Sequence, residues 1–560
     1  MNFNLLIGGA AGQGMETLSS TLSKILQKRG YQLFTLQDYM SRVRGGHNFF
    51  QIRFSENPVE THRDDLDGII ALNQETVDLH IGRLNKDGFI IADDDVVSDD
   101  PRVITIPAKK LSREIGNPKV QSSVILGALM KIYGLDVEHL DTILSAKFDE
   151  KVVKQNVDAF NIGHELVESR FVPPTITPSP SMLIQANEAI ALGALAGGLK
   201  FYSAYPMTPS TSIMSYLVQK SKKAKVVVEQ AEDEIAAINM AIGASYTGVR
   251  AMTGTSGGGF SLMVEAVGLA GIMETPLVIA EIQRPGPATG LPTRTEQSDL
   301  KFVINSSHGE FPKMVIALRN PEDAFYQTIR AFNLAEKYQI PVIIMGDQYM
   351  ADAVRTVKPF DLDKVKIERF MADEEVYRNG KEYKRYELTD TGISPNLRPG
   401  KVEGTMVNVD SDEHDEYGNM IESGEIRIQM VHKRERKFEL LKTEIIEPEL
   451  LGESEMDVLL LGWGSLHSPL TEAIELLNKD NGQKFGALVF GDVWPLPEKL
   501  LREKTAKAKV VINVEQNFTG QLASLISEVT GIRVDKSVLK YDGRPLSAVE
   551  IKNKVLEVLS

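Results

Sequence analysis

The chain has 560 residues, of which 42% are hydrophobic and 25% charged, and its formal net charge is −15 at pH 7. This composition excludes a mostly disordered chain, and the length predicts roughly three domains. The negative charge argues against nucleic acid as a partner. The chain has no cysteine, which excludes disulfides, cysteine-ligated iron–sulfur clusters, cysteine zinc sites and thiol nucleophiles on this polypeptide.

The N-terminal residues predict the start of an α/β domain. An apolar run at Phe3–Ile7 leads into a turn that contains Gly8, Gly12 and Gly14, and helical periodicity follows over Met15–Lys28, which is the pattern of strand, glycine-rich turn and helix. The stretch lacks a basic n-region, so it predicts a strand rather than a signal peptide. No apolar run of about 18 residues occurs, so we expect no membrane span and a cytoplasmic protein.

This first domain is predicted to span residues 1–170. Its further predicted strands are Tyr31–Leu36, Phe49–Ser55, Gly68–Ala71 and Gly88–Ala92. The next segment, residues 171–182, carries four prolines between Phe171 and Pro180. Because proline restricts the backbone to extended conformations, we predict an interdomain linker there.

Residues 183–357 predict a doubly wound parallel sheet, because strands alternate with helices after a first helix at Ile184–Gly198. The predicted strands are Phe201–Ala204, Val226–Val228, Arg250–Thr253, Leu277–Ala280, Lys313–Leu318 and Val342–Met345. Residues 358–452 are polar and lack clean periodicity, which predicts an extended connection with small sheet elements. A third α/β unit, residues 453–560, begins with a strand at Asp457–Gly462. The expected fold class is therefore multidomain α/β.

The stretch Val226–Ser245 carries an informative carboxylate. A β-branched strand is followed by an acidic turn and an apolar helix that begins near Glu234, and open α/β sheets bind ligands just past the carboxyl ends of their strands. Gly243 follows Glu234 by nine residues, a spacing that resembles the pyrimidine-binding domains of thiamine diphosphate enzymes and favours Glu234 over Glu232. Acidic residues that complement a helix macrodipole are the structural alternative.

Three further motifs resemble the alpha subunits of 2-oxoacid:ferredoxin oxidoreductases. They are FYSAYPMTPST at Phe201–Thr211, TSGGGFSLM at Thr255–Met263 and RPGPATGLPTRTEQSDL at Arg284–Leu300. The N-terminal domain, with its glycine-rich start and Arg44-Gly45-Gly46, resembles the gamma module of the same family. The closing domain resembles its transketolase-like C-terminal domain.

For the cofactor, the resemblance implies that Glu234 bonds to the aminopyrimidine ring of thiamine diphosphate and promotes its activation. The other implied cofactor contacts are Pro206, Thr255, Ser256 and Gly257. No histidine lies near Ser256 in the sequence to activate it as a nucleophile. We therefore interpret Thr255–Gly259 as backbone that approaches the cofactor closely.

For the substrate, the resemblance implies that Tyr205 and Thr208 contact a 2-oxoacid, with Thr208 held in a turn by the flanking prolines. A guanidinium can bind the oxoacid carboxylate with two hydrogen bonds, and Arg284 and Arg294 both lie in the matched loop. Counting back from Asp299 favours Arg284 without deciding between them. A proline-locked turn and structural surface arginines are the alternatives.

For coenzyme A, the resemblance implies a site formed partly by the gamma module. Gly8, Gly12 and Gly14 precede a helix whose free N–H groups can receive a phosphate. The sequence GGAAGQG departs from the dinucleotide pattern GxGxxG, so a tight structural turn is the alternative.

Two parts of such an enzyme are missing from this sequence. The magnesium–diphosphate motif GDG…N is represented only by Gly346-Asp347 and Gly491-Asp492, neither continued, so we predict no metal site on this chain. The cluster-ligating cysteines are also missing. The resemblance implies that a cysteine-bearing beta subunit supplies Mg²⁺, the rest of the thiamine diphosphate site and a [4Fe–4S] cluster, in a heterodimer or a dimer of heterodimers.

The resemblance implies coenzyme A-dependent oxidative decarboxylation of a 2-oxoacid to acyl-CoA and CO₂, with ferredoxin as electron acceptor. The fused gamma–alpha arrangement favours 2-oxoglutarate, and pyruvate and branched-chain or aryl 2-oxoacids are alternatives. A non-catalytic scaffold subunit and a thiamine enzyme that does not use ferredoxin are the other hypotheses. The presence of Glu234, Thr208 and both arginines argues against a scaffold.

Overall fold

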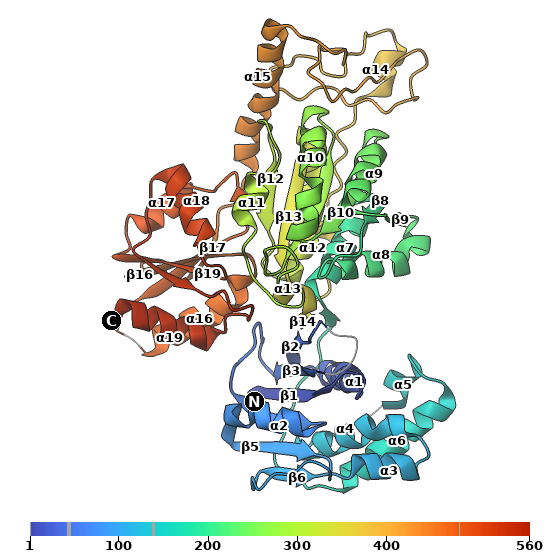
Figure 1. Cartoon of the computed structure of the whole chain (residues 1–560), viewed down its shortest axis with the longest axis vertical. Helices are drawn as coiled ribbons and strands as arrows, with labels where there is room; N and C mark the ends of the chain where they lie inside the picture. The colour runs from blue at the N-terminus through green and yellow to red at the C-terminus, as the bar shows by residue number, and fades with distance from the viewer. Residues whose placement is uncertain (1, 42–45, 137–139, 481) are drawn as a thin grey trace. The chain divides into compact units, whose positions relative to one another are not determined.

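The computed structural model describes residues 2–41, 46–136, 140–480 and 482–560. The chain divides into two compact units (Figure 1). The first comprises Met1–Ile184, Asp352–Pro359 and Ser547–Val549, and the second comprises Gln185–Ala351, Phe360–Leu546 and Glu550–Ser560.

The first unit is built on an eight-stranded sheet with the order β6-β5-β4-β1-β3-β2-β14-β7. Its strands are β1 (Asn2–Ala10), β2 (Gln32–Asp38), β3 (His47–Ser55), β4 (Leu66–Ala71), β5 (Leu84–Ala92), β6 (Val103–Thr105), β7 (Met182–Ile184) and β14 (Val354–Val357). Its helices are α1 (Met15–Lys28), α2 (Gln74–His80), α3 (Ala108–Glu114), α4 (Gln121–Ile132), α5 (Leu140–Ser145) and α6 (Glu150–Glu165). The strands and the first helix predicted for this region are all present.

Helices α4 and α6 cross in direct backbone contact. A Cβ on Gly127 would lie 1.9 Å from the Phe160 carbonyl oxygen, and one on Gly163 would lie 1.8 Å from that of Val124. Only glycine allows this approach. The crossing fixes α4, whose first turn lies at a cavity described below.

Strands β7 and β14 were not predicted from the sequence, and both belong to the sheet of the first unit. In the structure β14 pairs antiparallel with β2 and with β7, and the Leu33 amide donates to Thr356 Oγ1 at 3.0 Å. Short strands carry no sequence signal for the sheet they join, because pairing through the backbone is the same in any sheet.

The second unit contains a seven-stranded sheet with the order β18-β12-β13-β11-β10-β8-β9. Neighbouring strands are parallel except at β18. The strands are β8 (Leu199–Ala204), β9 (Val227–Gln230), β10 (Arg250–Thr255), β11 (Leu277–Gln283), β12 (Met314–Ala317), β13 (Pro341–Asp347) and β18 (Asp492–Trp494). This sheet confirms the predicted fold class.

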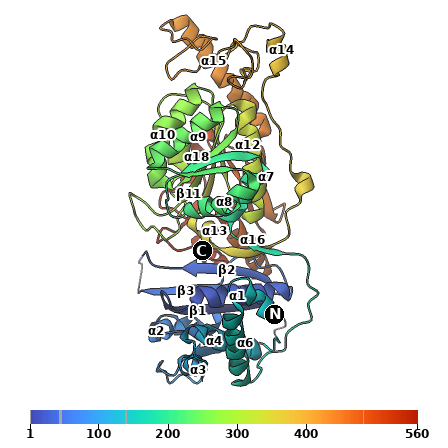
Figure 2. The same cartoon turned by 90° about the vertical axis from the view of Figure 1, so that its right-hand side faces the viewer.

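Helices cover the sheet in a doubly wound manner (Figure 2), with α9 packed on α10 and α7 packed on α12. The helices are α7 (Ala186–Ala196), α8 (Thr211–Ala224), α9 (Glu234–Tyr246), α10 (Gly257–Ile272), α11 (Leu300–Ile304), α12 (Pro321–Tyr338) and α13 (Gln348–Asp352). Helices α9 and α10 contribute Ile238, Ala241, Phe260 and Met263 to a core that extends into the C-terminal domain.

The C-terminal domain has a five-stranded sheet with the order β15-β17-β16-β19-β20, in which only β15 runs antiparallel to its neighbour. Its strands are β15 (Glu449–Gly452), β16 (Val458–Trp463), β17 (Phe485–Phe490), β19 (Val510–Glu515) and β20 (Lys536–Leu539). Its helices are α16 (His467–Asp480), α17 (Lys499–Thr505), α18 (Gln521–Thr530) and α19 (Ala548–Leu559).

The predicted connection, residues 358–452, contains a long helix besides small sheet elements, of which β15 lies at its end. This segment, described throughout, contains α14 (Glu374–Arg378), the long helix α15 (Gly424–Leu441) and one isolated bridge between His414 and Met420. Helix α15 has no apolar stripe because two of its buried positions are lysines. Lys433 Nζ and Lys437 Nζ each lie 2.5 Å from the fully buried Glu274 carboxylate.

The Glu274 ion cluster attaches α15 to the end of α10. Burial alone would raise the pKa of Glu274, but the charges of Lys433, Lys437 and Arg385 outweigh it and hold that pKa below its usual value. Since a buried charge needs a partner, the cluster gives this polar helix a defined position.

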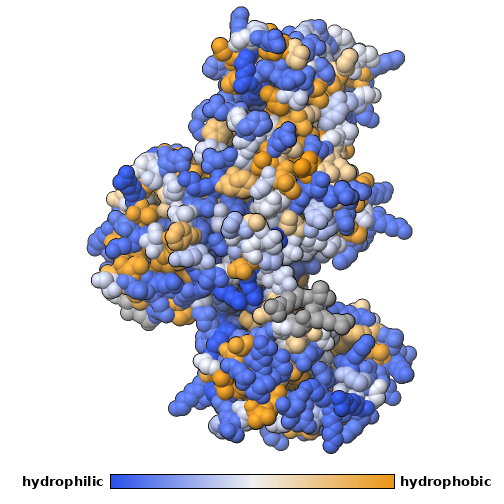
Figure 3. Space-filling model, in the orientation of Figure 1, coloured by the Kyte–Doolittle hydropathy of each residue, from blue (hydrophilic) through white to orange (hydrophobic). Residues whose placement is uncertain are grey.

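No described helix is long and apolar enough to cross a membrane. The face of the molecule drawn in Figure 3 is mainly hydrophilic, with hydrophobic groups interspersed.

Candidate active site

The functional side chains predicted from the sequence follow four neighbouring strands. Strands β9, β8, β10 and β11 lie side by side and run parallel, so their carboxyl ends meet at one edge of the sheet (Figure 1). Glu234 follows β9, Thr208 follows β8, Thr255 ends β10 and Arg284 follows β11. The topology therefore gathers four predicted residues at one edge.

Glu234 is the first residue of α9, whose N-cap Asp233 accepts a hydrogen bond from the Ala236 amide at 2.7 Å. Its side chain is buried, with 4% of the residue exposed, and Oε1 has no hydrogen-bond partner in the described chain. Buried polar atoms are rarely left unpaired. The Glu234 carboxylate is therefore ready to bind a group that this chain does not supply, whereas Glu232 is exposed.

The glycines after β10 make room for this carboxylate. A Cβ on Gly259 would lie 2.5 Å from Glu234 Oε1 and 2.1 Å from Thr255 Oγ1. Thr255 and Ser256 are fully buried, and Ser256 Oγ has no partner in the described chain. The backbone at Thr255–Gly259, predicted to approach the cofactor closely, thus fits tightly around Glu234.

Thr208 and Arg284 lie in contact. Arg284 Nη1 donates to the Thr208 carbonyl oxygen at 2.7 Å, and burial lowers the pKa of the guanidinium. Asn187 holds the Thr208 turn from behind by donating to the Pro209 carbonyl oxygen at 2.9 Å. Tyr205 and Pro206 are exposed at the same turn.

Arg294 lies elsewhere, against the C-terminal domain. A Cβ on Gly543 would be 3.1 Å from Arg294 Cβ, and the Thr295 amide donates to the Gly543 carbonyl oxygen at 3.3 Å. The structure therefore brings Arg284, and not Arg294, to Thr208.

Gln297 fixes the loop that follows Arg284. Its side-chain nitrogen Nε2 donates to the Trp463 carbonyl oxygen at 3.0 Å. Its backbone N–H donates to the Gln516 carbonyl oxygen at 2.7 Å, and its own carbonyl oxygen accepts from Asn517 Nδ2 at 3.0 Å. All four residues are buried. The ends of β16 and β19 in the C-terminal domain thus hold the loop.

Two buried acids, Glu281 and Asp347, and the partly buried Asp299 lie at the same edge and were not among the site residues predicted from the sequence. Glu281 is fully buried beside Thr255 in the ladder of β10 and β11. Burial, followed by the charge of Asp299, raises the pKa of Glu281 well above its usual value. Burial raises the pKa of Asp299 to about 6 and that of Asp347 to about 6. Glu281 and Asp347 could have been found from the sequence, because each is an acid within an otherwise apolar strand, LVIAEIQ and PVIIMGD respectively.

In the first unit, the glycine turn before α1 borders a cavity of about 650 Å³. Gly12 and Gly14, with φ angles of +93° and +84°, line it together with Lys119 and Gln121 at the start of α4. Gly8 does not line it; a Cβ there would be 2.5 Å from Thr76 Cγ2, so this glycine allows β1 to pack on α2. Arg44 and Gly45 lie outside the described residues.

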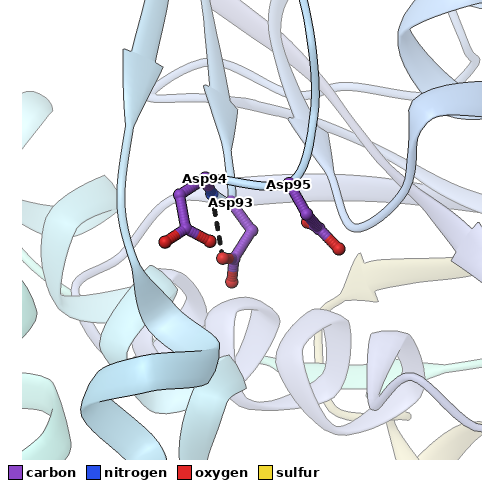
Figure 4. Close-up of side chains that lie close together, drawn as sticks. All are labelled: Asp93, Asp94 and Asp95. Carbon is purple, nitrogen blue, oxygen red and sulfur yellow. Dashed lines mark hydrogen bonds between the residues drawn. The ribbon is translucent and has the colours of Figure 1, made fainter.

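One group of acids in the described chain is close enough to hold a cation, Asp93, Asp94 and Asp95 (Figure 4). Asp93 accepts hydrogen bonds from the Asp94 and Lys109 amides, both at 2.9 Å, and Asp95 pairs with the Lys109 side chain. These contacts hold the start of α3, which accounts for the group without a metal.

Comparison with known proteins agrees with this geometry. Three family models match: "Pyruvate ferredoxin/flavodoxin oxidoreductase" over residues 4–166, "Pyruvate flavodoxin/ferredoxin oxidoreductase, thiamine diP-bdg" over residues 192–433 and "Pyruvate:ferredoxin oxidoreductase core domain II" over residues 456–550. The alpha subunit of 2-oxoacid:ferredoxin oxidoreductase 2 from Aeropyrum pernix is 33% identical, over 100% of this chain and 98% of the relative. The chain belongs to the 2-oxoacid:ferredoxin oxidoreductase family.

Other members include the 2-oxoglutarate oxidoreductase subunit KorA of Mycobacterium tuberculosis, 29% identical over 98% of this chain and 90% of the relative. The structure of 2-oxoglutarate:ferredoxin oxidoreductase from Magnetococcus marinus, with 2-oxoglutarate, coenzyme A and succinyl-CoA bound, superposes with a TM-score of 0.92 and 31% identity over 100% of both chains. Family, enzyme class and the thiamine diphosphate-binding domain are thereby confirmed. The chain is an alpha-type subunit of a multisubunit 2-oxoacid:ferredoxin oxidoreductase.

Replacing Gly259 with alanine tests the fit around Glu234. The added methyl group would overlap Glu234 Oε1 and Thr255 Oγ1, so we expect the carboxylate to move and activity of the assembled enzyme to fall by about 10²-fold. Gly258→Ala is the matched control, because a Cβ there meets only the Ala288 carbonyl oxygen, at 3.7 Å. Equal activity of the two variants would show that the Glu234 position is not critical.

Proposed function

We propose that this chain carries the 2-oxoacid site and the aminopyrimidine half of the thiamine diphosphate site of a 2-oxoglutarate:ferredoxin oxidoreductase that forms succinyl-CoA. The observation that carries the proposal is the Arg284–Thr208 contact at the sheet edge that also holds Glu234. The ligands named in the Magnetococcus marinus structure, which matches along the whole chain, support the choice of substrate.

Glu234 is the residue that would hold the aminopyrimidine ring. Its buried, unpaired Oε1 fits a ring nitrogen as hydrogen-bond donor, and Thr255, Ser256 and Gly257 provide the close backbone. Thiamine diphosphate, when bound, supplies the nucleophilic carbon and the electron sink for decarboxylation. In this environment Glu234 orients the ring and exchanges a proton with its nitrogen.

Arg284 and Thr208 would bind the oxoacid. The Arg284 guanidinium is half-buried and bonded to the Thr208 backbone, so its remaining N–H groups have a restricted direction. A desolvated guanidinium binds a carboxylate more strongly than an exposed one. The Thr208 hydroxyl, and Tyr205 beside it, are then within the same turn.

Coenzyme A would use the cavity of the first unit. The first turns of α1 and α4 both border it, and the N-terminus of a helix offers free N–H groups to a phosphate; Lys119 adds a positive charge. A volume of about 650 Å³ admits part of a coenzyme A molecule. Gly12 and Gly14 would line this site, and Gly8 would support it through β1.

A cysteine-bearing beta subunit would complete the enzyme and pass electrons to ferredoxin. The outer face of α9, next to Glu234, leaves Ile235 at 49% and Met240 at 42% exposure. Gly243 lies on this face next to open space, since a Cβ at this position would have no neighbouring heavy atom within 4 Å. Exposed apolar residues around an incomplete site are typical of an interface.

The test of this function uses the chain co-expressed with the beta subunit that it co-purifies with. Wild-type complex should reduce ferredoxin or a low-potential dye only with coenzyme A and a 2-oxoacid, fastest with 2-oxoglutarate. Glu234→Gln should lower kcat by about 10²- to 10⁴-fold, because the amide cannot exchange the proton. Glu232→Gln, at the exposed neighbour, should retain activity. An intact complex inert to all 2-oxoacids would support a scaffold, and turnover without ferredoxin reduction would support a different thiamine enzyme.

The two candidate arginines make separable predictions. Arg284→Lys should lower kcat/KM for the 2-oxoacid by about tenfold or more, since lysine cannot keep the Thr208 contact and bind the carboxylate with a fork. Arg294→Lys should leave KM for the 2-oxoacid near the wild-type value. Steady-state kinetics with 2-oxoglutarate measures both, and the reverse order of effects would assign the substrate to Arg294.

The partner surface is tested by Met240→Asp. A charge in the centre of the exposed apolar face should weaken beta-subunit association on the order of tenfold or more, without changing the stability of the chain. Met406→Asp is the control, because Met406 is 79% exposed in the segment that contains α15. Analytical ultracentrifugation of both variants decides; unchanged association of Met240→Asp would exclude α9 from the interface.

A further inference from the structure

Asp299 closes the base of the loop that carries Arg284. This loop leaves β11 after Gln283 and returns at Asp299, the N-cap of α11. The Asp299 backbone N–H donates to Gln283 Oε1 at the end of β11 at 3.0 Å, and Gln283 Nε2 donates to the Gly346 carbonyl oxygen at 3.1 Å. The two ends of the loop are therefore joined at the central strands of the sheet.

The Asp299 carboxylate also touches the segment that surrounds Glu234. A Cβ on Gly257, the first residue of α10, would lie 2.3 Å from Asp299 Oδ2. Gly259, which contacts Glu234, follows in the same turn of α10. Asp299 thus contacts both the base of the loop that carries Arg284, called the substrate loop below, and the first turn of α10.

Glu281 meets Asp299 from β11. After burial, the charge of Asp299 and a hydrogen bond to it raise the pKa of Glu281. Both Glu281 oxygens and Asp299 Oδ2 are buried atoms without a hydrogen-bond partner from the rest of the described chain. Two carboxylates offer only acceptors, so a bond between them needs a proton on one. The satisfied state of this pair is the one that holds a single proton.

The surroundings favour that state. The charged groups that act on Glu281 are Asp299 at the start of α11 and Asp347 at the end of β13, and Asp299 also acts on Glu296 in the loop. All are acids. Thr255 and Ser256, at the end of β10, and Gly257 of α10 bring no charge. Ionising both members would place two like charges together at low dielectric.

We propose that Glu281 and Asp299 are positioning residues that share one proton and thereby hold the substrate loop against the first turn of α10. The role in substrate binding rests on the function proposed above, because it requires Arg284 to bind the 2-oxoacid. The shared proton itself does not depend on that function. Loss of the shared proton would separate the base of the loop from Gly257. The position of Arg284 relative to Glu234 would then no longer be fixed.

The pH dependence has a defined sign. Glu281 keeps its proton in the folded chain at pH values where the unfolded chain has lost it. Stability from this group is therefore fully present below the ordinary glutamate pKa and falls as pH rises toward the folded-state pKa, by about tenfold in the unfolding constant per pH unit for one proton. Glu281→Gln donates the same hydrogen bond without needing a proton, so it lacks this decline.

The first measurement is thermal unfolding of the chain in its complex from pH 6 to pH 9. The Tm of Glu281→Gln minus that of wild type should increase steadily as pH rises. The Tm of Glu296→Gln, which removes a neighbouring acid but not the pair, should change with pH as the wild-type Tm does. A Tm difference that is constant with pH would contradict the shared proton. This readout needs no activity, so it stands even if the proposed substrate is wrong.

The second measurement is KM for 2-oxoglutarate over the same pH range. Above the pH at which the pair ionises, wild-type KM should rise by about tenfold per pH unit while kcat changes little; Glu281→Gln should show no such rise. Equal alkaline profiles would overturn the positioning role. Asp299→Asn, which also bonds to Glu281 without the shared proton, repeats both tests. Failure of both amide variants to fold, with Glu296→Gln folded, would also contradict the proposal.

Discussion

The site depends on one constraint: the Glu234 carboxylate is buried at the sheet edge, and its Oε1 has no hydrogen-bond partner among the residues that the structure describes. Gly259 is needed to make space for it and Asp233 fixes the helix that starts with it. Such an arrangement costs stability when the chain is alone, because buried polar atoms are normally satisfied. It is explained if the missing donor belongs to a cofactor, and the thiamine diphosphate-binding domain of this family provides one.

The same edge shows how three parts of the chain share a single site. Parallel strands bring Glu234, Thr208 and Arg284 together, and the C-terminal domain holds the intervening loop through Gln297. The acids Glu281 and Asp299 then link the base of that loop to α10. The C-terminal domain thus fixes this loop through the Trp463 carbonyl oxygen and the Asn517 side chain.

The sequence predicted the family, the parallel sheet and the residues at its edge, because strand–helix alternation and local motifs such as YPMTPS are contiguous. It could not choose between Arg284 and Arg294, since both lie in one loop and only the fold separates them. Gln297 was missed because its partners Trp463 and Asn517 lie far away in the chain. Glu281 was missed although an acid inside the apolar strand LVIAEIQ marks it. Helix α15 was missed because Lys433 and Lys437, which pair with Glu274, occupy buried positions of the helix. Charged residues at buried positions break the amphipathic pattern by which a helix is predicted. Strands β7 and β14 joined another sheet through backbone pairing, which leaves little trace in sequence.

The most direct test is an experimental structure of the chain in complex with its beta subunit, thiamine diphosphate and 2-oxoglutarate. The account predicts that a nitrogen of the aminopyrimidine ring lies within hydrogen-bonding distance of Glu234 Oε1 and that the 2-oxoglutarate carboxylate next to the oxo group binds Arg284. A ring bound away from Glu234, with Oε1 paired to a beta-subunit side chain instead, would contradict it.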